Sequence, residues 1–212
     1  MKDAIPVSVR IRQEWVGFRE LVRVLGWSRA LRVGMKMKSR VRQGGPWEKL
    51  QPPKDRAEQW SREQIAPAIV LYNELRKEGI PNPLDAIQAI VVRAAVPWMR
   101  HAIGPVSQQQ VDELQPEHRS AWFTQKIMPF LNMEVGRVEI EAKQVSFEVK
   151  RCFFPRLCRD AGVPELAPVF CQVDSYFFGD VQPEIELHRP TTLASGDTTC
   201  EFNLQFRLKP KE

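Results

Sequence analysis

Apolar residues in the first 130 positions recur at the three- and four-residue spacing of helices. One stripe predicts a helix over residues 61–77 that begins at a capping box of Ser61 and Gln64. Further stripes predict helices over 84–101 and from 115 through 130. An amphipathic helix is also expected near the N-terminus. Its apolar face comprises Trp15, Phe18, Val22 and Leu25.

After residue 130 the pattern changes to the alternation of apolar and polar residues that is typical of strands. It predicts strands over 135–142 and 144–151, and a last strand that starts at Cys200. The turn residues Ser195-Gly196-Asp197 predict a hairpin between that strand and residues 185–193. A helix is expected between Pro164 and Gly179, since proline favours a first turn and glycine follows a last one.

This order of elements predicts an α+β fold, in which an N-terminal helical half covers one face of an antiparallel sheet of about four strands with short helices. The chain is predicted to divide into a helical region over residues 1–130 and an α+β region over residues 131–212, and the two regions are expected to pack as one compact unit. A chain of 212 residues is long enough for such a core.

The composition is that of an ordinary globular protein, with 43% hydrophobic and 27% charged residues. No apolar run approaches the roughly 20 residues of a membrane-spanning helix, and the N-terminus has no signal-peptide core. These features predict a cytoplasmic protein. In that reducing compartment the four cysteines are expected to be free or metal-bound rather than paired.

The basic charge is concentrated at the N-terminus, where the sequence up to Arg42 contains eleven Lys or Arg residues but only three acidic residues. We expect most of these side chains to form a solvated face, with their stems over the helical half. Nucleic-acid binding is not expected, because the charges form no contiguous run. The alternatives are docking on an acidic partner protein or a membrane surface, or contact with a second copy of the chain.

Three cysteines lie at positions where a side chain could be aimed at a site. Cys171 and Asp174 share one face of the expected helix, at the edge of a stripe formed by Phe170, Val173 and Phe177. Cys200 points the same way as the apolar face of its strand, and Cys152 marks the end of another strand. The alternative is that all three are small buried hydrophobic residues, as most free cysteines are.

These segments resemble the L-2-amino-thiazoline-4-carboxylic acid hydrolase family over roughly the last third of the chain. The motifs that carry the resemblance are Phe147 to Cys152, Gly162-Val163-Pro164-Glu165-Leu166, Cys171-Gln172-Val173-Asp174, His188-Arg189-Pro190-Thr191-Thr192 and Gly196-Asp197-Thr198-Thr199-Cys200-Glu201-Phe202. The ending is more distantly similar to vinyl-reductase-type sensor domains. Cys158 is an extra thiol, and Glu201 stands where many members of the family carry Asp.

The resemblance implies a hydrolase that opens a C=N or C–N bond in a small, carboxylated heterocycle. Cys171, Cys200 or Cys152 would supply a nucleophilic thiolate, with Asp174 or Glu201 orienting the substrate or moving protons. Alternatively, Cys152, Cys171, Asp174 and Cys200 would hold Zn²⁺. Either use of the thiols requires the three cysteines to converge.

Three further residues are candidates for binding the substrate. Arg189 would clamp a substrate carboxylate or pair with Glu186 or Glu201, and His188 and Glu201 lie beside it in the sequence. The competing hypotheses are a ligand- or zinc-binding module without turnover and a non-catalytic accessory protein of a biosynthetic pathway. Phosphate-binding loops, serine-hydrolase elbows and paired Cys-x-x-Cys motifs are absent from the sequence.

Overall fold

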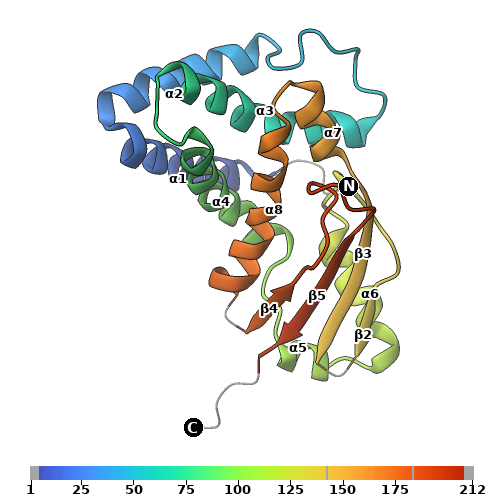
Figure 1. The fold of residues 1–212 in the computed structure, drawn as a ribbon. Helices are drawn as coiled ribbons and strands as arrows, with labels where there is room; N and C mark the ends of the chain where they lie inside the picture. The colour runs from blue at the N-terminus through green and yellow to red at the C-terminus, as the bar shows by residue number, and fades with distance from the viewer. Residues whose placement is uncertain (1–4, 142, 183, 208–212) are drawn as a thin grey trace.

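The computed structural model describes residues 5–141, 143–182 and 184–207 (Figure 1). The N-terminal part is helical, with α1 (Val7–Leu25), α2 (Trp27–Arg42), α3 (Arg56–Lys77), α4 (Pro83–Ala102), α5 (Gln108–Asp112) and α6 (Pro116–Ile127). The strands follow as β1 (Met133–Val135), β2 (Glu139–Glu141), β3 (Gln144–Cys152), β4 (Ile185–His188) and β5 (Cys200–Phe206). Between β3 and β4 lie α7 (Phe153–Asp160), the 3-10 turn η1 (Pro164–Leu166), α8 (Ala167–Tyr176) and the π-helical turn η2 (Phe177–Val181).

The predicted α+β fold is confirmed. The described strands form one antiparallel sheet in the order β1-β3-β5-β4, and β2 pairs with β3 on the edge that β1 also uses. In the centre, Phe147 of β3 lies opposite Phe202 of β5, and their rings stack with centroids 4.7 Å apart. Helix α8 passes between the helical layer and the sheet (Figure 1).

Two apolar clusters fill the interior. One joins α1–α4 to α7 and the start of α8, and it includes Leu21, Ile69 and Leu157. The other joins the sheet to the end of α4 and to α5, α6 and η2, and it includes Phe123 and Phe177. A buried stripe on α3 contributes to the first cluster, as the sequence predicts for Ile65, Ile69, Tyr72 and Leu75.

Several predicted boundaries are wrong for local reasons. Helix α3 begins earlier than expected, because Asp55 accepts the Glu58 amide at 2.7 Å as the N-cap, whereas the Ser61 hydroxyl donates back to the Ala57 carbonyl. The strand expected over 135–142 is divided between β1 and β2 within the described residues 135–141, and residue 142 lies outside them. The register shifts between Glu134 and Val135, and the Gly136 amide donates to the Glu148 carbonyl at the end of β1. A capping box of Ser107 and Gln110 starts the unpredicted helix α5.

The hairpin and the helix after Pro164 also differ from expectation. Strand β4 ends at His188, so residues 189–199 form a long connection to β5 rather than more of a strand. The helix expected to end at Gly179 runs through a 3-10 turn, an α-helix and a π-helical turn that ends at Val181. Of its expected buried stripe only Phe177 is fully buried, whereas Phe170 and Val173 are half-buried.

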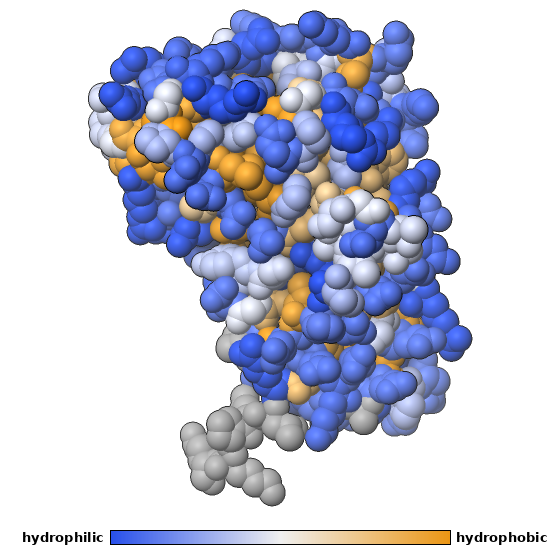
Figure 2. Space-filling view, viewed as in Figure 1, coloured by the Kyte–Doolittle hydropathy of each residue, from blue (hydrophilic) through white to orange (hydrophobic). Residues whose placement is uncertain are grey.

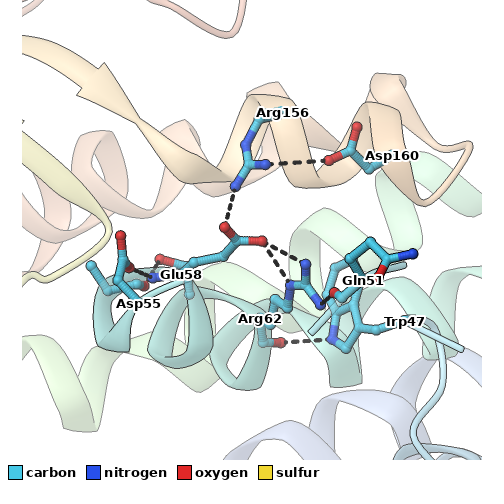
Figure 3. A network of polar contacts seen from close by, with 9 residues as sticks. Trp47, Gln51, Asp55, Glu58, Arg62, Arg156 and Asp160 are labelled. Carbon is cyan, nitrogen blue, oxygen red and sulfur yellow. Dashed lines mark hydrogen bonds and ion pairs between the residues drawn. The ribbon is translucent and has the colours of Figure 1, made fainter. Parts of the chain in front are cut away.

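A buried ion-pair network holds α7 against α3 (Figure 3). The Glu58 carboxylate is 2% exposed and accepts from Arg62 on its own helix and from Arg156 of α7 at 3.0 Å. Burial raises the pKa of Glu58, but the hydrogen bonds and charges of Arg62 and Arg156 outweigh that effect and lower it. The network thus anchors α7, the helix that begins directly after Cys152.

Within the described residues, no helix is both long and apolar enough to cross a bilayer.

Candidate functional site

A large cavity separates the helical layer from the sheet. Its volume is about 710 Å³, and apolar side chains from α1–α4, α8 and the sheet make up most of its wall. The residues of this wall that are exposed to solvent all come from α1, α2 and α3, so the mouth of the cavity lies between these helices. They are Arg10, Glu14, Leu31, Met35, Lys38 and Glu63. Figure 2 shows apolar side chains gathered over this part of the helical layer and continuing toward the sheet.

The far wall of this cavity carries the residues that the sequence singled out. Cys171 and Asp174 reach it from α8, Cys200 from the start of β5 and Cys152 from the end of β3. Arg189 reaches it from the connection after β4. Segments that are far apart in the sequence therefore bring three thiols, a carboxylate and a guanidinium to one surface.

Asp174 and Arg189 form an ion pair on this wall. Arg189 Nη1 donates to Asp174 Oδ2 at 2.8 Å, and Nη2 donates to the carbonyl oxygen of Cys171 at 2.7 Å. The guanidinium also lies over the Phe202 ring, 5.1 Å from its centroid. Only 7% of the Arg189 side chain is exposed, against 28% of Asp174, so the carboxylate is the more accessible partner.

The thiols in this site are protonated near neutral pH. Burial raises the pKa of Cys152 to about 11 and that of Cys171 to about 12, and burial raises the pKa of Cys200 as well. Hydrogen bonds with the Phe154 backbone and Asn132 oppose the shift in the pKa of Cys152, and the charge of Arg189 opposes that of Cys171. The Leu193 amide opposes the shift of Cys200, and none of these interactions cancels the effect of burial. Burial also raises the pKa of Asp174, and the charge of Arg189 opposes that shift.

The zinc arrangement is not supported by this geometry. In the part of the chain that the structure describes, no three His, Cys, Asp or Glu side chains are grouped as metal ligands. Cys152, Cys171, Asp174 and Cys200 share the cavity wall but do not form such a group, and Asp174 is already paired with Arg189. All four cysteines are free thiols.

His188 and Glu201 do not reach the cavity. Both are exposed, and neither lies on the cavity wall. Glu201 alternates with the inward residues Cys200 and Phe202, so its side chain lies on the opposite face of β5. Arg189 pairs with neither Glu186 nor Glu201, because the chain turns toward α8 after His188. Glu186 instead pairs with Arg207 at 3.5 Å.

Two residues of the site were not anticipated. Asn132 is 9% exposed and its side-chain amide donates to Cys152 Sγ at 3.7 Å. The Leu193 amide donates to Cys200 Sγ at 3.2 Å. A signal for Asn132 existed in the sequence, since a polar residue between Leu131 and Met133 at the start of a strand is expected to need a buried partner. The Leu193 contact depends on the shape of the connection to β5 and has no local signal.

Comparisons with known proteins give one match. Neither the curated proteins nor the solved structures contain a match to this chain. The model of the L-2-amino-thiazoline-4-carboxylic acid hydrolase family matches residues 60–204, which include Cys152, Cys171, Asp174, Arg189 and Cys200. The match covers more than half of the chain, from within α3 to within β5. The chain therefore belongs to the L-2-amino-thiazoline-4-carboxylic acid hydrolase family.

Proposed function

We propose that the protein hydrolyses a C=N or C–N bond of a small heterocycle that binds in the cavity. The observation that carries the proposal is that Cys171, Asp174 and Arg189 all line one mostly apolar cavity. Family membership supports a hydrolase acting on a small molecule. The size and apolar wall of the cavity favour a substrate that carries an apolar group in addition to its ring.

In the proposed reaction Cys171 is the nucleophile and Asp174 moves its proton. The thiol needs a base, because burial raises the pKa of Cys171 to about 12, far above neutral pH, and only the thiolate is nucleophilic. Asp174 lies one helical turn after Cys171, and its raised pKa makes its carboxylate a stronger proton acceptor. Arg189 is a positioning residue that holds one oxygen of that carboxylate.

The bonds in this reaction balance with one water consumed. Cys171 Sγ forms a bond to the C=N carbon, while the thiol proton passes through Asp174 to the ring nitrogen. A water oxygen then replaces sulfur on that carbon. One proton of the water goes to sulfur and the other to the departing nitrogen, so the C–N bond breaks, a carbonyl forms and the thiol is regenerated.

Turnover of L-2-amino-thiazoline-4-carboxylic acid, and of thiazolines with added alkyl groups, tests this function. We expect Asp174→Asn to lower kcat by about 10²- to 10⁴-fold with a small change in binding, because the proton acceptor is lost. Cys171→Ala should abolish turnover. Cys158→Ala is the matched control, since this thiol is fully buried and does not line the cavity. Unchanged turnover in Asp174→Asn would contradict the proposal.

A second candidate function is the binding of an apolar ligand without turnover. It is favoured by the protonated thiols and by Arg189, whose donors already serve Asp174 and Cys171. In this case ligand released from the protein after long incubation is chemically unchanged. Asp174→Asn and Cys171→Ala would then alter affinity alone, and both proteins would release the same compound that was added.

A further inference from the structure

The N-terminal helices expose several large apolar residues. Trp15, which belongs to the apolar face predicted for the first of these helices, is 59% exposed. It belongs to a stripe at four-residue spacing on α1. A second stripe with the same spacing lies on α2. Together the two stripes form the hairpin face: Val7, Ile11, Trp15, Trp27, Leu31 and Met35.

The hairpin face is continuous with the contact between the two helices. Its members are between 46% (Leu31) and 66% (Trp27) exposed. The Trp27 ring packs edge-on against Phe18 of α1, with centroids 5.5 Å apart. Each stripe repeats every four residues, so it lies along one side of its helix and not around it. Exposed apolar residues that gather in this way mark an interaction surface.

Basic side chains flank this face. Arg10 and Arg12 lie on either side of Ile11 in the sequence and Arg32 follows Leu31; all three are exposed and form no ion pair with any described residue. The Arg19 guanidinium lies 5.0 Å from the centroid of the Trp15 ring. The acids of the hairpin are already paired, Glu14 with Lys38 at 2.7 Å and the buried Glu20 with Arg23 at 2.8 Å. The face therefore combines an apolar centre with a positive border.

We propose that the hairpin face docks the protein on an anionic lipid bilayer. Tryptophans and aliphatic side chains with a border of Lys and Arg are the composition of helices that lie in the headgroup region. A second copy of the chain fits less well, because a symmetric contact would place two positive borders opposite each other. The proposal concerns residues outside the matched family segment 60–204 and does not depend on the reaction.

Docking in this orientation would place the mouth of the cavity at the membrane. Leu31 and Met35 belong both to the hairpin face and to the exposed part of the cavity wall, and Lys38 and Glu14 bridge α2 and α1 beside them. An apolar ligand could then pass between bilayer and cavity without crossing bulk water, which avoids the cost of exposing its apolar surface.

Sedimentation of the whole protein with lipid vesicles tests the proposal. We expect binding to vesicles of phosphatidylcholine and phosphatidylserine in equal amounts, weaker binding as salt rises, and little binding to phosphatidylcholine alone. Each arginine near the surface contributes about fivefold to partitioning, so Arg10→Gln, Arg12→Gln and Arg32→Gln together should lower it about a hundredfold. The matched control is a triple variant in which three exposed lysines outside the hairpin, Lys49, Lys54 and Lys143, are replaced by Gln.

A second pair of variants separates the apolar contribution. Ile11→Ser should reduce vesicle binding several-fold, whereas Met128→Ser, which changes a residue that is 67% exposed elsewhere, should not. The proposal is overturned if the protein fails to bind the mixed vesicles at low salt, or if both triple variants lose binding equally. A dimer in solution that dissociates in Ile11→Ser would instead assign the hairpin face to a second copy of the chain.

Discussion

The donors of Arg189, a candidate for binding a substrate carboxylate, are directed at the protein itself. Its sequence context suggested a clamp for a substrate carboxylate, but the structure has its donors on Asp174, the Cys171 carbonyl and the Ser175 hydroxyl. A guanidinium that is only 7% exposed and bonded on both terminal nitrogens supports α8 and orients Asp174. The reactive end of the cavity therefore offers a carboxylate and thiols to a ligand, rather than a free positive charge.

Removing this guanidinium should change the titration of its partner. In Arg189→Gln the pKa of Asp174 should rise further, because the charge that stabilises the carboxylate is lost while burial remains. NMR of the labelled Asp174 carboxyl carbon measures this shift directly. Arg207→Gln, which changes an exposed arginine paired with Glu186, is the control. An unchanged pKa in Arg189→Gln would show that the ion pair does not form in solution.

The reactivity of Cys171 toward iodoacetamide should report its raised pKa. Because only the thiolate reacts, the alkylation rate should rise about tenfold per pH unit from pH 7 to pH 10 without a plateau. Mass spectrometry of the labelled peptide follows each cysteine separately. A plateau near pH 8 would mean that the site holds a thiolate already. A ligand in the cavity should slow labelling of Cys171.

At the scale of the elements, α3 and α7 show which structural features could be predicted from the sequence and which could not. The buried stripe of α3 follows from spacing alone, because burial of one face is a local property of a helix. The bond from Glu58 to Arg156 joins residues almost a hundred positions apart, and no local pattern encodes it. The same distinction holds for the site, where Cys171 and Asp174 share a helix, but Asp174 and Arg189 meet only through the course of the chain after β4.

Breaking the α3–α7 network should destabilise the protein. Glu58→Gln leaves Arg62 and Arg156 without a buried counter-charge, so the free energy of unfolding should fall by about 3–5 kcal/mol. Urea denaturation measures this difference. Glu63→Gln is the control, because Glu63 lies on the same helix and is exposed. Equal losses in the two variants would contradict the stated role of Glu58.

The same network should make the stability of the folded protein depend on pH, and the direction of that dependence follows from the pKa of Glu58. The folded protein lowers the pKa of Glu58, so the stability that this carboxylate contributes is complete above its unfolded pKa and is lost as pH falls through the folded value. Wild-type protein should therefore lose stability below about pH 4. Glu58→Gln should show a flatter acid limb in denaturation curves recorded across this range, since it has no proton to take up at that position.

At the scale of the whole molecule, the cavity joins the two apolar clusters and spans most of the helical layer. Ala95 lines it from α4, whereas Ala89 on the same helix does not. Ala95→Trp should therefore fill part of the space and lower the affinity for an apolar fluorescent probe at least tenfold. Ala89→Trp should leave probe binding unchanged. Fluorescence titration with each variant distinguishes binding in the cavity from adhesion to the hairpin face.

Most residues of the mouth of the cavity, all except Glu63, lie in a different part of the chain from its thiol-bearing wall. The thiols, Asp174 and Arg189 fall within the segment that matches the family, whereas Arg10, Leu31 and Lys38 precede it. Under the proposed function, substitutions in α1 and α2 would change which molecules enter the cavity without moving Cys171 or Asp174. Selection on the choice of substrate would then act on the first 42 residues and leave the proposed reaction unchanged.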